Sequence, residues 1–340
     1  MTPQPVRYLV LWLTTQCNLH CAYCYRPAEP PSRMPESVAR QALELAALSG
    51  LPFHVQLAGG EPTLEPDLIE HIGALIRQKN WPVSLAIQTN GTRISPKLIE
   101  SCLRYRIEVG VSLDGPPEVQ QRIRGMARET YRGLALLDAS GVPVRVTAVL
   151  SSETLATAPA LVMSLASFRN VRGFGFDPVV PKGAALGRVG FEGDSAAARC
   201  SARETCAAVA LVNRQGHRSL VWREYEAVQA ARRTGRARVH YCHAAQGESM
   251  AVHPSGAVYP CSQVAGEPAF AAGTLEAVEW HPLKSAFHGV RLICPDASCT
   301  LAGCCPGDCP SRIHFQNPSN APVVCGLYRG IADYLAGEVS

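Results

Sequence analysis

The chain has 340 residues, more than a single hydrophobic core usually spans, so one large and one small domain are expected. Its 32 Lys and Arg against 28 Asp and Glu give a formal net charge of +4, far short of the basic balance of a dedicated nucleic-acid-binding protein. The apolar run at residues 9–13 is too short to span a bilayer, and residues 1–20 carry no signal-peptide pattern. We therefore expect a cytoplasmic protein with neither a membrane nor a nucleic-acid partner.

Short β-branched apolar runs alternate with longer helical patterns between residues 6 and 180, which is typical of repeated βα units and a parallel sheet. The expected strands are residues 7–13, 53–58, 83–88, 107–113, 142–149 and 173–177. The expected helices are residues 36–48, 66–79, 96–104, 117–139 and 154–167. The pattern predicts an α/β fold, a partial (β/α)6 TIM-like barrel, over residues 1–190.

The rest of the chain divides into two further parts. Residues 191–235 are expected to form a bridging helical segment, Ala-rich over 195–213, and a linker. Residues 236–340 hold eight cysteines amid Pro, Gly and Asn, with a probable hairpin over 249–252 and 257–259 but little other apolar periodicity. Such a segment is expected to fold around bound metal.

Arginines gather in and just after the linker, at Arg232, Arg233, Arg236 and Arg238. The simpler interpretation is a solvated face, and docking of an acidic peptide segment is the alternative.

Fourteen cysteines are many for a cytoplasmic chain, where the thiol pool keeps cysteines reduced. Clustered cysteines in that compartment indicate metal binding or redox chemistry rather than disulfides. Three cysteines lie apart from any cluster in helical, Ala- and Leu-rich surroundings, and we expect them to be buried as small hydrophobic residues: Cys102, Cys200 and Cys206.

Three clustered cysteines follow the first predicted strand with the spacing C-x3-C-x2-C: Cys17, Cys21 and Cys24. Their thiolates can converge on one cubic iron–sulfur cluster from a single loop, which leaves one of its four irons without a protein ligand. A loop after strand one lies on the C-terminal face of a βα barrel, where such folds place their active sites. A zinc site is the alternative for this spacing.

The segment Gly59-Gly60-Glu61-Pro62 follows the second predicted strand. Glycines let the backbone approach a ligand closely, and the Glu61 carboxylate offers acceptors for an ammonium group. Alone, the tetrapeptide would be an ordinary strand-to-helix turn, but one βα unit after the cysteine loop it predicts a ligand site. Polar side chains also follow the third and fourth predicted strands, at Asn90, Ser112 and Asp114.

With these motifs the chain resembles the radical SAM enzymes. The resemblance implies a [4Fe-4S] cluster on Cys17, Cys21 and Cys24 whose open iron chelates the amino and carboxylate groups of S-adenosylmethionine (SAM). It implies that Tyr23 lies next to the adenine and that the SAM-binding residues also include Gly59, Gly60, Glu61, Asn90, Ser112 and Asp114. Arg124 is the expected partner of the SAM carboxylate, with Arg122 or a merely solvated arginine as alternatives.

The C-terminal cysteines resemble the seven-cysteine SPASM signature, which implies two auxiliary iron–sulfur clusters, probably of the [4Fe-4S] type. The implied ligands of auxiliary cluster I are Cys242, Cys261 and Cys309. Those of auxiliary cluster II are Cys294, Cys299, Cys305 and Cys325. Cys294 and Cys299 are separated by four residues where the family usually has two, and Cys304 could replace Cys305. Structural zinc is the alternative for this region.

A fourth protein ligand is missing from auxiliary cluster I, because Arg236 stands where sulfatase maturases resemble one another in having a cysteine. An open iron is the favoured interpretation, and closure of the site by His240 or His243 is the alternative.

The resemblance implies reductive cleavage of SAM to a 5′-deoxyadenosyl radical that abstracts hydrogen from a substrate, with a ribosomally synthesised peptide as the leading substrate and a thioether or carbon–carbon crosslink as the product. The alternatives are sulfatase-maturase-like protein oxidation and the biosynthesis of haem or of a peptide-derived cofactor. Outside enzymes, an iron–sulfur electron carrier or a zinc-stabilised binding module would share the cysteines. The expected partners are a peptide or small protein, an external low-potential electron donor and, since the chain begins close to strand one, a separate leader-peptide-recognition protein.

Overall fold

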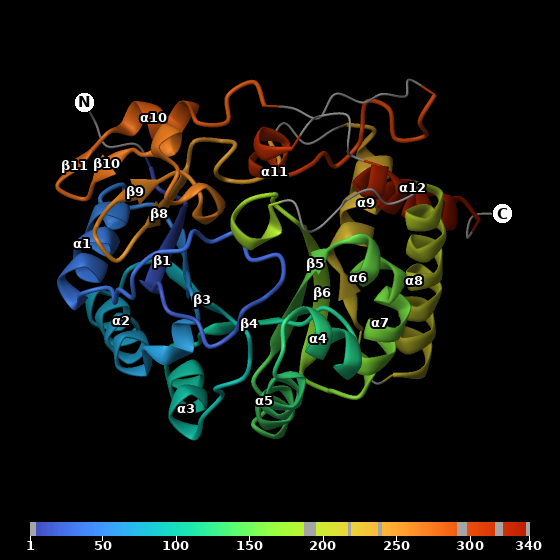
Figure 1. Ribbon diagram of the computed structural model, residues 1–340, viewed down its shortest axis with the longest axis horizontal. Coiled ribbons are helices and arrows are strands. Elements are labelled where there is room, and N and C mark those ends of the chain that lie inside the picture. The colour runs from blue at the N-terminus through green and yellow to red at the C-terminus, as the bar shows by residue number, and fades with distance from the viewer. Residues whose placement is uncertain are drawn as a thin grey trace.

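The computed structural model describes residues 5–186, 195–216, 219–236, 240–290, 298–316 and 322–337. Its centre is a curved parallel sheet whose first six strands lie side by side in chain order (Figure 1). These strands are β1 (Tyr8–Thr14), β2 (Phe53–Gly59), β3 (Val83–Thr89), β4 (Glu108–Ser112), β5 (Val144–Leu150) and β6 (Val171–Pro178). The predicted α/β partial barrel is confirmed, and all carboxyl ends of its strands meet at one rim.

The helices that connect these strands cover the outside of the sheet (Figure 1). They are α1 (Glu36–Ala47), η1 (Pro62–Leu64), α2 (Pro66–Lys79), α3 (Pro96–Tyr105), α4 (Pro117–Ile123), α5 (Ala127–Ala139), α6 (Ser152–Ala156) and α7 (Ala158–Ala166). The single helix predicted over 117–139 is therefore wrong, because the chain breaks between α4 and α5, where Gly125 has φ +83° and Met126 has φ +50°. The helix predicted over 154–167 is likewise divided, at Thr157.

Both edges of the barrel sheet are extended by strands from later in the chain. β7 (Val221–Trp222) pairs with β6, while β8 (Ser249–Val252) pairs in parallel with β1 and carries β9 (Val258–Tyr259) as an antiparallel neighbour. The predicted hairpin is thus confirmed, and it belongs to the barrel sheet, which has nine strands within the described residues. This pairing fixes the start of the cysteine-rich region to the edge of the barrel.

The remaining elements of the cysteine-rich region are short. They are η3 (Ser262–Val264), η4 (Pro268–Phe270), β10 (Gly273–Thr274), β11 (Ala277–Val278), α10 (Trp280–Ser285) and α11 (Pro310–Phe315). One more short helix, η2 (Gly183–Ala185), follows β6.

Three longer helices pack beside the barrel: α8 (Ser195–Gln215), α9 (Arg223–Thr234) and α12 (Pro322–Gly337). Two glycines let α12 pack closely on α8, because a Cβ added at Gly326 would lie 2.5 Å from the Ser195 carbonyl oxygen, and one at Gly330 would lie 2.3 Å from that of Arg199. The last helix of the described chain therefore returns to the helix that follows the barrel.

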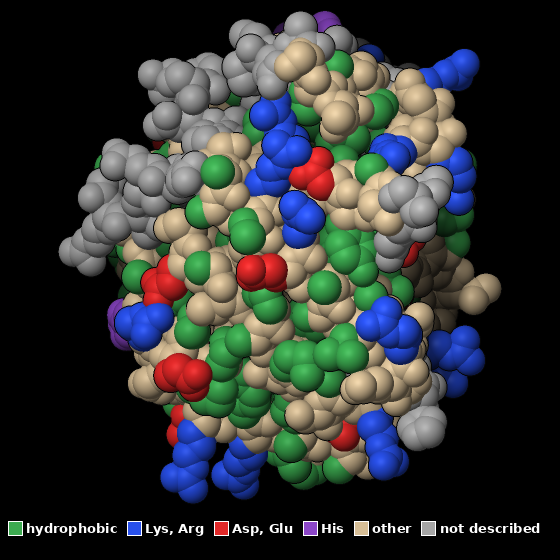
Figure 2. All heavy atoms as spheres, turned by 90° about the vertical axis from the view of Figure 1, so that its right-hand side faces the viewer, with side chains coloured by type: hydrophobic (Ala, Val, Ile, Leu, Met, Phe, Trp, Pro, Cys, Tyr) green, Lys and Arg blue, Asp and Glu red, His purple; other side chains and the backbone are tan. Residues whose placement is uncertain are grey.

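The predicted solvated face of the linker arginines agrees with the exposure of Arg233 and Arg236. Arg232 instead donates from Nη1 to the Ala332 carbonyl oxygen at 3.1 Å, and Arg238 lies outside the described residues. On the side of the molecule where α8 and α12 lie, positive and negative side chains are interspersed (Figure 2).

Buried aliphatic side chains from the strands and the covering helices form one main core. Cys102 and Cys206 are buried in it as predicted, but the same prediction for Cys200 is wrong. Cys200 is exposed because α8 turns its other face, with Ala198 and Ala202, toward the protein. None of the helices in the described ranges is long and apolar enough to cross a membrane.

Candidate active site

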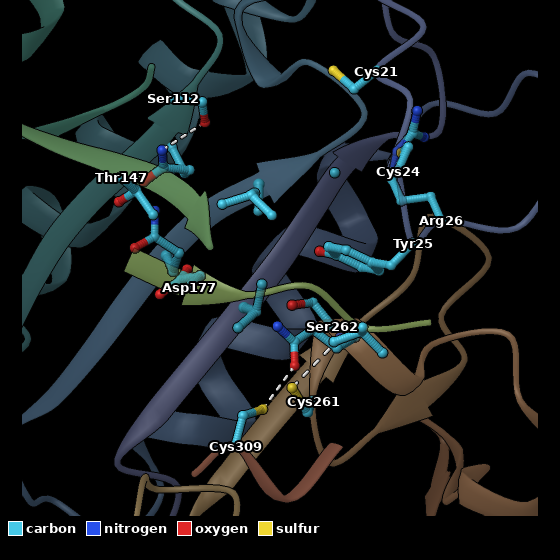
Figure 3. A pocket seen from close by; sticks show the side chains of 18 of the residues that line it. Cys21, Cys24, Tyr25, Arg26, Ser112, Thr147, Asp177, Cys261, Ser262 and Cys309 are labelled. Atoms are coloured by element: carbon cyan, nitrogen blue, oxygen red, sulfur yellow. Dashed lines mark hydrogen bonds between the residues drawn. The ribbon is translucent and has the colours of Figure 1, made fainter. Parts of the chain in front are cut away.

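A cavity of about 540 Å³ lies inside the barrel and reaches the carboxyl ends of its strands. Two groups of cysteines line it. The first group is Cys17, Cys21 and Cys24 from the loop after β1, and the second group is Cys242, Cys261 and Cys309 from the C-terminal region (Figure 3). The structure thus brings together, around one cavity, the residues that the sequence assigned to the SAM cluster and to auxiliary cluster I.

The loop that carries the first group is held by the backbone after β2. A Cβ added at Gly60 would lie 1.8 Å from the Gln16 carbonyl oxygen, so only glycine fits there. The Gly60 amide donates to the Thr14 carbonyl oxygen at 2.7 Å, and the Glu61 amide donates to the Gln16 carbonyl oxygen at 2.8 Å. The two glycines of the GGEP segment therefore serve the cysteine loop, whatever else they bind.

The Glu61 side chain lines the cavity wall but is only 1% exposed. Its Oε1 accepts hydrogen bonds from the Thr63 and Thr89 hydroxyls, both at 2.6 Å, and its Oε2 accepts from the Asn90 amide at 2.7 Å. Burial raises the pKa of Glu61, while these hydrogen bonds act in the opposite direction. The carboxylate ties together the ends of β2 and β3, and its contact with a SAM ammonium group stays a prediction.

Asn90 and Ser112 also line the cavity. The Asn90 side chain donates to Asn18 Oδ1 at 2.9 Å, and Asn18 in turn donates to the Thr92 hydroxyl at 2.8 Å. Asn18 belongs to the cysteine motif, so this network joins the end of β3 to the cysteine loop. The signal that could have found Asn18 was its place directly after Cys17.

Tyr23 and Arg124 line the cavity, whereas Asp114 lies behind them. Arg124 Nε lies 2.7 Å from Asp114 Oδ2, and the Tyr23 hydroxyl donates to the same oxygen. The Val149 amide donates to Asp114 Oδ1 at 2.8 Å. The guanidinium also lies 5.3 Å from the centre of the Tyr23 ring. Asp114 therefore holds the two side chains that were assigned to adenine and carboxylate recognition, and the SAM contacts of all three stay predictions.

The chemistry around the second group suits iron–sulfur ligation. The Gln263 amide donates to Cys261 Sγ at 3.5 Å, the amides of Ala244 and Ala245 stabilise the Cys242 thiolate, and those of Ser311 and Arg312 stabilise that of Cys309. Backbone donors of this kind are typical of cysteines that bind cluster iron. Burial nevertheless raises the pKa of Cys261 to about 11, so metal binding there must displace a proton.

A site for a single metal ion is not what these residues form. Among the described parts of the chain, no three His, Cys, Asp or Glu side chains gather closely enough to hold one ion. A four-iron cube is wider than one ion, and thiols spread around a cavity suit it better than they suit tetrahedral zinc. Both groups that face the cavity therefore fit a cluster.

The third set of predicted ligands lies elsewhere. Cys299 and Cys305 pack against the main core, Cys325 lies on α12, and Cys294 falls outside the described residues. Assignment of auxiliary cluster II to these four cysteines stays a prediction, as does a role for Cys304, which is buried. Of the two candidate histidines, His243 lines the cavity and His240 is exposed.

Sequence reasoning missed two cavity residues. Asp177, near the end of β6, forms an ion pair with Arg223 at 2.9 Å, and the end of the sixth predicted strand was the signal that could have found it (Figure 3). The Tyr25 hydroxyl bonds the Ser262 side chain, and burial raises the Tyr25 pKa to about 12. Because Tyr25 follows Cys24 and Ser262 follows Cys261, this bond joins the two cysteine groups.

Comparison with known proteins relates this site to one superfamily. Residues 13–162 match the model of the Radical SAM superfamily. The chain spans between 39% and 64% of the length of the first curated relatives that it matches. It is 27% identical to the serine-type anaerobic sulfatase-maturating enzyme of Klebsiella aerogenes, over 98% of this chain and 86% of that protein.

Two solved structures share the fold at low sequence identity. The structure of anSMEcpe with bound AdoMet and Cp18Cys peptide has a TM-score of 0.76 at 18% identity, covering 99% of this chain and 98% of that chain. The structure of Streptococcus suis SuiB bound to precursor peptide SuiA has a TM-score of 0.69 at 16% identity, covering 93% of this chain and 74% of that chain. The likeness includes the C-terminal region.

Proposed function

Since residues 13–162 belong to the radical SAM superfamily, we propose that the protein reductively cleaves SAM and uses the resulting radical to modify a peptide. One observation carries the proposal. The first cysteine group, the GGEP backbone and the Tyr23–Arg124 pair share a cavity of about 540 Å³ with the second cysteine group. A cavity of this size accommodates a ligand such as SAM together with one substrate side chain.

The residues have separable tasks. Cys17, Cys21 and Cys24 would hold a [4Fe-4S] cluster which, when bound, supplies the electron that splits SAM into methionine and a 5′-deoxyadenosyl radical able to remove hydrogen from a substrate. Arg124, held by Asp114, presents a fixed guanidinium to the cavity, where the SAM carboxylate is the matching group. The Tyr23 ring offers a flat apolar face to the adenine. The surrounding strands exclude water from the radical.

The second cysteine group would hold auxiliary cluster I on the other side of the same cavity. Removal of a hydrogen atom from a substrate leaves an unpaired electron, which must pass to an acceptor before a closed-shell oxidised product can form. Cys242, Cys261 and Cys309 are well placed to supply that acceptor, because the substrate must lie between them and the first group. An external low-potential donor reduces the first cluster.

A peptide substrate is supported by the relatives that share the fold. Both solved structures described above contain a bound peptide, and the full-length curated relative acts in sulfatase maturation. We infer that the modified residue of a peptide enters the cavity while the rest of the peptide stays outside. A separate leader-recognition protein is part of this proposal.

The test uses protein reconstituted with iron and sulfide under anaerobic conditions. With SAM and dithionite it should form 5′-deoxyadenosine, and the triple variant with Cys17, Cys21 and Cys24 replaced by Ala should form none while it keeps the iron of the auxiliary clusters. A variant with Cys242, Cys261 and Cys309 replaced by Ala should lose about four irons and still cleave SAM. Undiminished 5′-deoxyadenosine in the first variant would overturn the proposal.

A second candidate is oxidation of a protein side chain, as in sulfatase maturation. The observation in its favour is the match to a sulfatase-maturating enzyme over 98% of this chain. Incubation with peptides that contain Ser or Cys in a sulfatase context separates the two candidates. Loss of two hydrogen atoms without a crosslink, seen by mass spectrometry, supports the oxidation.

A further inference from the structure

Gln263 contacts two cysteines of the second group at once. It follows Cys261 on η3, where its backbone amide donates to Cys261 Sγ at 3.5 Å. Its side-chain Oε1 lies 3.1 Å from Cys309 Sγ. Figure 3 shows Cys261 and Cys309 facing each other across these two hydrogen bonds. Gln263 is therefore the side chain that touches the sulfur of a proposed ligand from a neighbouring segment.

The direction of the side-chain hydrogen bond depends on the state of the sulfur. A Cys309 thiol donates its proton to Oε1, as the distance indicates. An iron-bound thiolate has no proton and can only accept, so the glutamine must present its Nε2–H group instead. The two ends of a side-chain amide exchange places by a half-turn about its last torsion, and both ends can form hydrogen bonds.

The surroundings keep this side chain in place during such a turn. The neighbouring Val264 is fully buried, and its amide donates to the Cys261 carbonyl oxygen at 3.2 Å. On the other side the buried Lys182 ammonium lies 3.5 Å from the Gln263 carbonyl oxygen and 2.7 Å from that of Ala265. Cys309 is only 8% exposed, so water competes little for its sulfur.

We propose that Gln263 is a positioning residue whose side-chain amide donates a hydrogen bond to the Cys309 thiolate and raises the reduction potential of the cluster on Cys242, Cys261 and Cys309. This inference rests on the proposed function, because it requires that cluster. A donor to a ligand sulfur stabilises the reduced cluster, which carries one more negative charge, more than the oxidised cluster. A raised potential favours passage of an electron from a substrate radical to this cluster.

The experiment is a potentiometric titration followed by electron paramagnetic resonance, in the background where Cys17, Cys21 and Cys24 are Ala. Gln263→Leu removes the donor and should lower the midpoint potential, by up to about tenfold in the ratio of reduced to oxidised cluster, or about 59 mV. Gln263→Glu should lower it further, because a carboxylate cannot donate and adds negative charge. Gln56→Leu is the matched control, since Gln56 lines the same cavity but bonds Tyr8 and the Leu57 carbonyl oxygen.

A second measurement does not depend on the stability of the variants. In the same background with Gln263 intact, side-chain ¹⁵N-glutamine labelling should give a coupled nitrogen in pulsed resonance of the reduced cluster. The coupling should persist in Gln56→Leu. Unchanged potentials in both Gln263 variants, or no coupled nitrogen, would overturn the role of Gln263 and leave the proposed function standing. Full iron and an unchanged auxiliary signal after removal of Cys242, Cys261 and Cys309 would overturn this cluster assignment, while the SAM-cleavage test would still decide the first cluster.

Discussion

Arg124 and Asp114 form a buried ion pair, with Nε and Oδ2 2.7 Å apart and with 9% and 0% of the two side chains exposed. Arg122, two residues earlier, forms an exposed pair with Glu153. The two arginines were competing candidates for one role, and the structure separates them. Only Arg124 faces the cavity, because the chain breaks after α4.

Replacement of Arg124 by Ala should lower the free energy of unfolding by about 3–5 kcal/mol, because it leaves the Asp114 carboxylate buried without its cation. Arg122→Ala should cost only about 0–1 kcal/mol, since its pair is exposed. Urea denaturation of the iron-free proteins measures both values. Equal costs for the two variants would mean that the buried pair is not formed.

Replacement of Gly60 by Ala should disrupt the first cluster site. The new methyl group would overlap the Gln16 carbonyl oxygen, so the cysteine loop has to move. We expect loss of about four irons and of 5′-deoxyadenosine formation. Gly50→Ala is the control: Gly50 has φ +66° with nothing near its Cβ position, so its cost should be only about 1–2 kcal/mol of backbone strain, with full iron content. A Gly60→Ala protein with all its iron would contradict the close packing.

Lys182 should matter for stability although it lies in a loop. Its ammonium group donates to the Ala265 carbonyl oxygen at 2.7 Å, lies 3.1 Å from Glu267 Oε1 and is 8% exposed. Lys182→Met keeps the length but removes the donors, so the free energy of unfolding should fall by about 1.5–3 kcal/mol. Lys97→Met, which breaks the exposed pair with Asp67, should cost about 0–1 kcal/mol. Similar costs in chemical denaturation would show that the Lys182 contacts are not formed.

The buried thiols should react slowly in iron-free protein. Burial raises the pKa of Cys21 and that of Cys261 to about 11, from an ordinary value of 9.0. At pH 8 both are therefore mostly protonated, and iodoacetamide should label the exposed Cys200 first. Their labelling rates should rise roughly tenfold per pH unit up to pH 10. Mass spectrometry of the alkylated peptides measures the order, and faster labelling of Cys21 than of Cys200 at pH 8 would contradict it.

The same shifts predict how stability depends on pH. Between pH 9 and 11 the folded iron-free protein holds protons on Cys21 and Cys261 that the unfolded chain has released. Stability must then fall as the pH rises through that window. Replacement of both thiols by Ser should flatten the fall, which thermal unfolding at several pH values can measure.

Much of the barrel could be predicted because its signals are local. All six predicted strands are present with small shifts at their ends, since alternation of apolar runs and helical patterns needs no knowledge of distant residues. The family assignment rested on two short motifs at strand ends and is confirmed by the match over residues 13–162. The Cys17 loop could be placed for the same reason.

What could not be predicted depends on contacts between distant parts of the chain. The parallel pairing of β8 with β1 joins residues 249–252 to residues 8–11, and no pattern in either strand names its partner. The bond between Gln263 and Cys309 depends in the same way on where α11 begins. Asp177 was within reach, because it follows the rule that had already singled out Ser112 and Asp114.

The pairing of β8 with β1 also sets an order of assembly. A ribosome releases β1 and the first cysteine loop long before β8, so β1 lacks one of its two neighbours until residue 252 has been made. Until then, the side of the cavity later closed by Cys242 and Cys261 is missing. Long-range strand pairing is slow, and it leaves earlier segments exposed meanwhile. Delivery of iron and sulfide to Cys17, Cys21 and Cys24 during synthesis would therefore meet an open loop, whereas delivery to the finished protein must pass through the completed wall.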